Sequence, residues 1–175
     1  CNFGKHLFQP LFHVRNGGNI TILPIALGES EYQFVIDLKD WCEKNKNEMR
    51  TKGLELFLLR NLSRGKGVGF FEAGNFHPDF ILWILSGDKQ YVHFIEPHGL
   101  MYEGINSEKI QFYKRIKEIE TRIADPKVIL SCWILSWTPK QELKLRGYDP
   151  EEYLKKNVVF MEDPGYIDSM ISLII

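Results

Sequence analysis

Two acidic residues border consecutive apolar segments of the chain. Asp79 follows a proline and precedes the run 80–85 (FILWIL), and Glu96 follows the run 91–95 (YVHFI). The residues between the runs, 86–88 (SGD), are typical of a turn, so we expect a β-hairpin. A carboxylate beside a buried strand is costly unless it is paired or binds a metal. We therefore expect the two acids to meet and to hold a divalent cation through oxygen ligands. A closed ion pair of either acid with arginine or lysine would count against this site.

A third acid lies at the start of the clearest predicted helix. Ser30 and Gln33 have the spacing of a capping box, and apolar residues from 34 to 42 form one stripe. Glu31 shares the inward face of that helix and is a candidate for the same site. An equally open alternative is that Glu31 only complements the helix dipole.

Several polar residues near these elements are weaker candidates. Side chains alternate along a strand, so Gln90 and His98 share the face of Glu96. The basic turn 60–67 has glycines and cations that suit DNA phosphates, although a solvated turn is as consistent with it. The candidates are the phosphate contacts Arg60, Arg64 and Lys66 and the accessory site residues Glu72, Gln90 and His77.

The motif Pro78-Asp79, followed by Glu96-Pro97-His98, resembles the PD-(D/E)xK nuclease superfamily. The longer run LLRNLSRGKGVGFFEAGNFHPDFILWIL…FIEPHGL resembles the C-terminal nuclease region of bacterial type III restriction-like, DEAD/DEAH-box helicase-associated proteins. The resemblance covers roughly 30–137. It departs from the usual motif at His98, where the superfamily has lysine; histidine keeps the position but lacks a permanent charge.

The resemblance implies an endonuclease domain that hydrolyses DNA phosphodiester bonds with Mg²⁺, or with Mn²⁺ in its place. Asp79, Glu96 and the carbonyl of Pro97 would bind the metal, Glu31 would add an acid, and His98 would take the lysine's place. The implied partners are DNA, a helicase or translocase motor in the same polypeptide or complex, and a methyltransferase or specificity subunit. The implied setting is restriction or defence in the bacterial cytoplasm. The alternative is a catalytically decayed nuclease fold that binds DNA or docks a helicase.

The pattern of segments predicts an α/β fold with a central mixed sheet flanked by helices, in the order αβββαβ of a restriction-endonuclease-like core. We expect an N-terminal hairpin or linker at 1–28, the nuclease core at 29–140 and a C-terminal extension packed on it at 141–175. The expected helices are 30–42, 107–124 and 166–175, the expected strands are 54–59, 68–71, 80–85, 91–95, 128–137 and 158–161, and 45–52 is expected to be a loop.

The composition is that of an ordinary globular chain, with 44% hydrophobic and 26% charged residues. The net charge of −1 means that any DNA-binding surface would be a local patch. Three widely spaced cysteines lack metal-ligand spacing and are expected to be reduced thiols. No long uncharged apolar run is present, so membrane insertion is not expected. Because the chain begins at Cys1 rather than at methionine, we expect a domain of a longer polypeptide.

Overall fold

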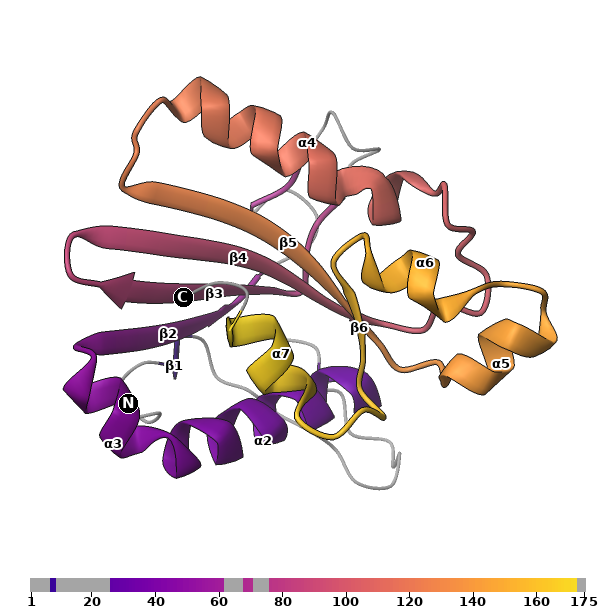
Figure 1. Ribbon diagram of the computed structural model, residues 1–175, viewed down its shortest axis with the longest axis horizontal. Coiled ribbons are helices and arrows are strands. Elements are labelled where there is room, and N and C mark those ends of the chain that lie inside the picture. The colour runs from indigo at the N-terminus through magenta and orange to yellow at the C-terminus, as the bar shows by residue number, and fades with distance from the viewer. Residues whose placement is uncertain (1–6, 9–25, 62–67, 71–75, 173–175) are drawn as a thin grey trace.

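A mixed β-sheet forms the centre of the computed structural model, which describes residues 7–8, 26–61, 68–70 and 76–172 (Figure 1). Within these residues the strands follow one another across the sheet in sequence order. Strands β2, β3 and β4 are antiparallel, whereas β4, β5 and β6 are parallel, and the short β1 runs parallel to β2. The strands are β1 (Leu7–Phe8), β2 (Leu54–Arg60), β3 (Phe80–Ser86), β4 (Lys89–His98), β5 (Val128–Ser136) and β6 (Val158–Phe160).

Helices cover both faces of this sheet (Figure 1). One face packs against α2 (Glu29–Lys44), α3 (Lys46–Thr51) and α7 (Tyr166–Ser172). The other face packs against α4 (Glu108–Ile123). Two short helices, α5 (Lys140–Leu145) and α6 (Pro150–Leu154), lie beyond the end of the sheet that β6 borders.

Strand alternation divides the core between the two faces. On β4, Ile95 belongs to the core beneath α2, whereas Val92 and Phe94 belong to the core beneath α4. Successive side chains on a strand point to opposite faces, so even-numbered residues of β4 face α4. This assignment decides which helix Glu96 meets.

The hairpin of β3 and β4 has a two-residue turn that fixes its register. Ser86 pairs with Lys89, and Gly87 between them has a φ of 59°. Glycine adopts this left-handed conformation without steric cost, as the first position of a tight hairpin turn requires. Every pair along the hairpin, as far as Phe80 with Ile95, follows from that turn.

The expectation of an α/β fold with a mixed sheet flanked by helices is confirmed. The order α2, β2, β3, β4, α4, β5 is αβββαβ, with α3 as an additional helix after α2. The strand predicted at 158–161 is present as β6, and α7 lies within the range predicted for the closing helix. The predicted N-terminal hairpin or linker at 1–28 falls outside the described residues, apart from β1 and residues 26–28.

Two predictions about individual segments are wrong. The short strand predicted at 68–71 is absent from residues 68–70, where Phe70 forms only an isolated bridge with Phe76. Asn61 holds this segment instead, since its side chain binds both the N–H and the carbonyl of Val68. The predicted loop at 45–52 contains α3, because Met49 is buried in the core beneath α2.

Candidate functional site

Asp79 and Glu96 lie side by side at one end of the β3–β4 hairpin. The last pair of the ladder is Phe80 with Ile95, and one further step places Asp79 opposite Glu96. The backbone N–H of Asp79 donates a hydrogen bond to Oε2 of Glu96 at 3.2 Å. The structure thus brings together the two acids that the sequence predicted to meet.

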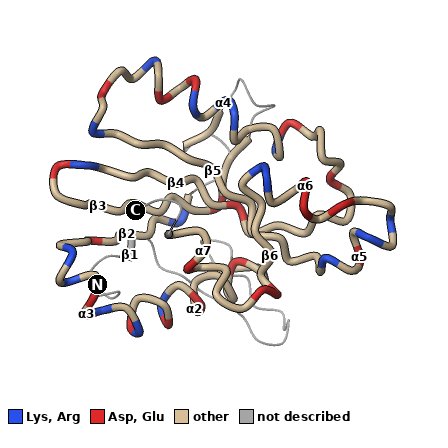
Figure 2. The backbone as a smooth tube through the Cα atoms, in the orientation of Figure 1, with Lys and Arg blue, Asp and Glu red and all other residues tan. Residues whose placement is uncertain are grey.

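Glu96 is buried, with 6% of its surface exposed, on the face covered by α4. The central strands carry few charged residues, so this carboxylate lies in an otherwise apolar sheet (Figure 2). Lys109, in the first turn of α4, places Nζ 2.7 Å from Oε1 of Glu96. This is a closed ion pair of one acid with lysine, an arrangement that counts against a metal site at these acids. The hydroxyl of Ser107 caps this helix by accepting from the N–H of Ile110, which fixes where the first turn begins.

Lys109 was not among the site residues predicted from the sequence. The residue belongs to a helix rich in charged side chains, where a lysine ordinarily faces solvent. Its position just after the helix start and one short connection beyond β4 is the signal that could have drawn attention to it. No sequence pattern states which strand residue a helical side chain will meet.

The carboxyl group of Asp79 experiences more negative than positive charge. Burial, followed by repulsion from Glu96 and then from Glu31, raises its pKa from 3.8 to about 8, and Lys109 only partly opposes this shift. The group is therefore substantially protonated at neutral pH when no cation is bound. A bound divalent cation would favour the ionised form.

Glu31 stands at the edge of this cluster and also caps α2. The predicted N-cap, Ser30, is wrong: the N-cap is Gly28, whose N–H donates to Oε2 of Glu31 at 2.7 Å. The Ser30 hydroxyl instead donates to the carbonyl of Pro97 at 3.2 Å, which ties the start of α2 to the end of β4. Glu31 has a structural role at the helix start, and it is still close enough to raise the pKa of Asp79.

Arg60 belongs to the cluster rather than to an open surface. Its side chain is 11% exposed, and Nη2 lies 3.5 Å from Oε2 of Glu31 and 3.4 Å from the carbonyl oxygen of Ala26. A guanidinium held in this way stabilises the start of α2 and offsets the charge of Glu31. The other predicted phosphate contacts, Arg64 and Lys66, and the accessory acid Glu72 lie outside the described residues.

His98 continues β4 beyond Pro97 and is half-buried near the same cluster. Its Nε2 lies 3.8 Å from Oε1 of Glu103, and burial together with Lys109 lowers the pKa of the imidazole. A neutral imidazole can donate or accept a hydrogen bond but brings no positive charge. The permanent charge near Glu96 comes from Lys109.

The remaining two candidates lie apart from the acids or are tied to other groups. Gln90 is exposed near the start of β4, about 20 Å along the strand from Glu96, and accepts a hydrogen bond from the Trp83 indole at 3.3 Å. His77 packs so closely on Gly69 that a Cβ there would lie 2.1 Å from its ring. Its buried Nδ1 has no partner among the described residues.

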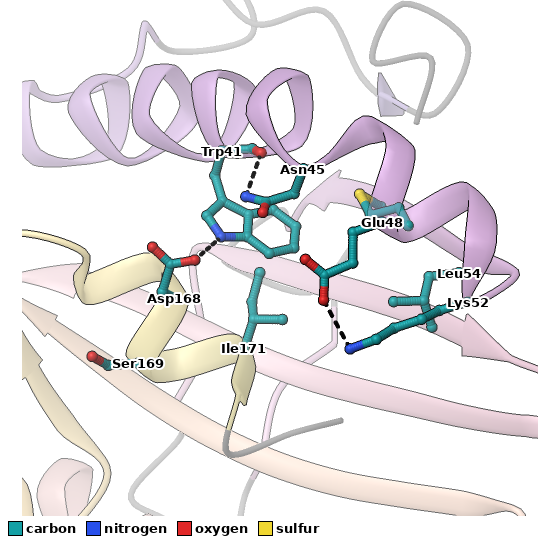
Figure 3. Close-up of a pocket in the computed structure, with 9 residues that line it drawn as sticks. Trp41, Asn45, Glu48, Lys52, Leu54, Asp168, Ser169 and Ile171 are labelled. Carbon is teal, nitrogen blue, oxygen red and sulfur yellow. Dashed lines mark hydrogen bonds and ion pairs between the residues drawn. The ribbon is translucent and has the colours of Figure 1, made fainter.

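A pocket of about 390 Å³ lies away from the acids, between the C-terminal half of α2, α3 and α7 (Figure 3). It includes Leu54 at the start of β2, whereas the acids lie at the other end of the hairpin strands. The Trp41 indole donates to Oδ1 of Asp168 at 2.5 Å on one side, and Lys52 pairs with Glu48 at 3.0 Å on the other (Figure 3). The pocket takes no part in the acid cluster.

The carboxylates of Asp79 and Glu96 are the oxygen donors that this cluster would offer to a divalent cation. Among residues 26–61, 68–70 and 76–172, no group of three or more His, Cys, Asp or Glu side chains is arranged to hold a metal ion. Mg²⁺ ordinarily retains several waters and uses one or two carboxylates, which Asp79 and Glu96 provide. Counting Glu31, the cluster holds three carboxyl groups against the two cations Arg60 and Lys109. Only when Asp79 is ionised do these groups carry one more negative than positive charge, and a bound divalent cation would offset that excess.

No family model matches the chain, and no curated protein and no solved structure is significantly similar to it. In the described part of the chain, no helix combines the length and the apolar character needed to cross a bilayer.

Proposed function

We propose that this chain is a Mg²⁺-dependent DNA endonuclease domain of the PD-(D/E)xK type, with a restriction-endonuclease-like core. The observation that carries the proposal is the pairing of Asp79 with Glu96 at the end of a buried hairpin, with the Lys109 ammonium beside them. Carboxylates at this density are costly without a function, since the raised pKa of Asp79 shows that its ionised form is disfavoured.

Each residue of the cluster has a distinct role in this proposal. Asp79 and Glu96 hold the metal, and the Pro97 carbonyl is a candidate third oxygen donor. When bound, the metal polarises the scissile phosphate and makes a coordinated water a better nucleophile. Lys109 provides the positive charge that stabilises the phosphate as negative charge develops on it. Glu31 and Arg60 hold the start of α2 at the end of β2, and the Ser30 hydroxyl ties it to the end of β4.

His98 contributes shape and hydrogen bonding rather than charge. In the motif that the chain resembles, lysine would stand where His98 stands, and Glu103 lies near Nε2 of the His98 imidazole. Lys109 reaches the Glu96 carboxylate from α4, so the positive charge comes from a helix instead of the strand. In this proposal the substitution at His98 is compatible with activity.

The wider setting follows from the same proposal. A helicase or translocase motor, in the same polypeptide or in a complex, would deliver DNA to this domain. A methyltransferase or specificity subunit would select the sequence. The bacterial cytoplasm is the compartment in which restriction or defence of this kind takes place.

A second candidate is a decayed nuclease fold that binds DNA or docks a helicase. The ion pairs of Glu96 with Lys109 and of Glu31 with Arg60 favour it, because they neutralise two acids without a metal. Among the described residues Asp79 has no comparable cation of its own, and its raised pKa argues that the pairing is incomplete. We therefore rank metal-dependent cleavage first.

The deciding experiment combines cleavage with metal binding. Supercoiled plasmid is incubated with the protein and Mg²⁺ or Mn²⁺, and Mn²⁺ binding is measured by calorimetry. Asp79→Asn and Glu96→Gln should abolish both, whereas Asp88→Asn, at the exposed turn of the same hairpin, should leave both unchanged. The binding module would be established instead if the protein neither nicks DNA nor binds Mn²⁺. In that case DNA binding should be salt-sensitive and unchanged by both substitutions.

A further inference from the structure

Exposed apolar side chains concentrate on two segments that lie together near the end of β4. The loop 99–107 follows β4, and the segment 137–148 follows β5. Arg146 joins the segments by donating to the carbonyl of Met101 at 3.1 Å. We call this surface the aromatic rim, and it consists of Met101, Tyr102, Trp137, Leu145, Arg146 and Tyr148.

The backbone on both sides of Tyr102 is anchored. The N–H of Leu100 donates to Oγ1 of Thr138 at 2.8 Å, and the carbonyl of Glu103 accepts from the Tyr153 hydroxyl at 3.1 Å. Lys156 holds the next turn through the carbonyl of Ile105 at 3.2 Å. A loop fixed in this way nevertheless presents the Tyr102 side chain to solvent, with 91% of the residue exposed. The exposed ring adds little to folding, so its presentation points to a binding partner.

The chemistry at Tyr102 suits a nucleotide. The guanidinium of Arg146 lies 5.7 Å from the centre of the Tyr102 ring. Neither Arg146 nor the exposed Lys144 forms an ion pair with a described residue, so both charges are available to phosphates. An aromatic face beside cations is the combination by which proteins bind unpaired bases and their backbone.

The aromatic rim adjoins the acid cluster. The N–H of Trp137 donates to the carbonyl of His98 at 3.0 Å, which places one member of the rim against the strand that carries Glu96. Tyr102 follows Glu96 by six residues, and that length of chain spans about 21 Å at most. One short strand of DNA can therefore contact both places.

We propose that the aromatic rim binds single-stranded DNA by stacking an unpaired base on Tyr102, while Arg146 and Lys144 contact its phosphates. Bases of an intact duplex are already stacked and do not offer a face to such a ring. The domain therefore acts where a strand has been opened, at a fork or a flap. This inference rests on the proposed action on DNA, and it specifies the form of the substrate.

The test measures DNA binding apart from cleavage. Fluorescence anisotropy in EDTA follows a labelled twelve-nucleotide thymidine oligomer and a duplex of the same length, using the full chain with Asp79→Asn. We expect tighter binding of the single strand. Tyr102→Ala and Tyr102→Leu should weaken that binding roughly 5- to 100-fold, while Tyr102→Phe, which keeps the ring, should bind as before.

The controls separate stacking from other uses of the surface. Ile123→Ala removes an exposed apolar side chain at the far end of α4 and should not change binding. Tyr102→Leu binding the oligomer as tightly as the parent, or equal affinity of the parent for single and double strands, would overturn the inference. A loss of self-association in Tyr102→Ala without any loss of DNA binding would assign the rim to protein contact and would also overturn it.

The outcome is independent of whether the site cuts. If cleavage requires Asp79 but DNA binding does not depend on Tyr102, the proposed function is retained and the role of the aromatic rim is rejected. If single strands bind in a way that depends on the Tyr102 ring, but no added metal supports cleavage, the role of the aromatic rim is supported and the nuclease is rejected.

Discussion

The ammonium of Lys109 lies 2.7 Å from Oε1 of Glu96, although the two residues belong to a helix and a strand on opposite sides of a connecting loop. The pair joins the first turn of α4 to the end of β4, and it brings a permanent positive charge to the two acids. His98, two residues beyond Glu96, has a lowered pKa and brings none at neutral pH. Substitutions at positions 98 and 109 separate the contribution of this charge from that of the fold around it.

Replacing Lys109 should reduce cleavage more than it reduces folding. We expect Lys109→Met to lower kcat about 100-fold or more, because a preorganised positive group near the phosphate is lost. Lys109→Arg should retain a measurable part of the rate. Single-turnover cleavage with Mg²⁺ provides the measurement, and thermal unfolding in EDTA shows how much stability the ion pair contributed. A drop in Tm without a drop in kcat would reduce Lys109 to a structural partner of Glu96.

Placing lysine at position 98 should matter only when Lys109 is absent. His98→Lys alone should change the cleavage rate by less than about threefold, since the required charge is already present. In the Lys109→Met background, His98→Lys should raise the cleavage rate at least about tenfold. The two variants and their combination form a double-mutant cycle measured under one set of conditions. Additive effects would mean that the two positions do not share a role.

The metal-free protein should lose stability as the pH rises toward 8. Folding raises the pKa of Asp79 from 3.8 to about 8, so the folded state binds more protons than the unfolded state between these values. The contribution of this group is therefore present below about pH 4 and is lost as the pH rises to 8. Asp79→Asn should remove this dependence, so that its stability advantage over the parent grows across the same range. Urea unfolding in EDTA from pH 5 to 9 measures it.

Adding Mg²⁺ at pH 8 should reverse the order of stability of the parent and Asp79→Asn. At pH 8 the parent should gain stability from Mg²⁺ while Asp79→Asn should gain little, since binding to the folded state stabilises it. An advantage of Asp79→Asn that stays constant with pH, or equal stabilisation of both proteins by Mg²⁺, would contradict the account of the charge imbalance.

His93 should make the fold sensitive to acid. The Ser131 hydroxyl accepts from the Trp133 indole at 2.7 Å and also shares a hydrogen bond with Nδ1 of His93 at 2.6 Å. Burial lowers the pKa of His93 from 6.5 to about 3, because a charged ring would lie in the core. Stability from this neutral ring is present above about pH 6.5 and is lost as the pH falls to 3.

His93→Gln should therefore weaken the acid dependence of unfolding. We expect the number of protons taken up on unfolding near pH 5 to be lower in the variant, by up to about one. Urea unfolding between pH 4 and 7 measures this slope in both proteins. Identical slopes would show that His93 is not a source of the acid sensitivity, whatever the effect of the substitution at neutral pH.

The end of α4 offers a stabilising substitution away from the site. Ala124 is exposed and has a φ of 53°, a left-handed conformation that strains residues with a Cβ. Ala124→Gly should raise the free energy of unfolding by about 0.5–1 kcal/mol, and Ala124→Val should lower it. Urea unfolding with unchanged cleavage would establish the effect as conformational. A destabilised glycine variant would contradict the assignment of strain.

The hairpin shows how far local sequence information reaches. Two apolar runs separated by a short turn, with alternating side chains, were sufficient to place Asp79 opposite Glu96. Residues this close in sequence are connected by one turn whose geometry sets every later pair. The helical ranges of α2 and α4 followed similarly from the apolar stripes and from capping residues, although the cap of α2 proved to be Gly28.

Tertiary packing alone decided the surroundings of the two acids. The sequence presented Lys109 as one charge among many on α4, and the burial of Phe112 and Ile116 against the sheet turned its side chain toward Glu96. Arg60 and Glu31 meet because α2 packs across the strands, not because of any spacing between them. The sequence by itself determined the αβββαβ order and the acid pair, since these depend on short-range turns and periodicity. Which cations reach the pair depends on contacts between distant segments, which form only when both faces of the sheet are covered.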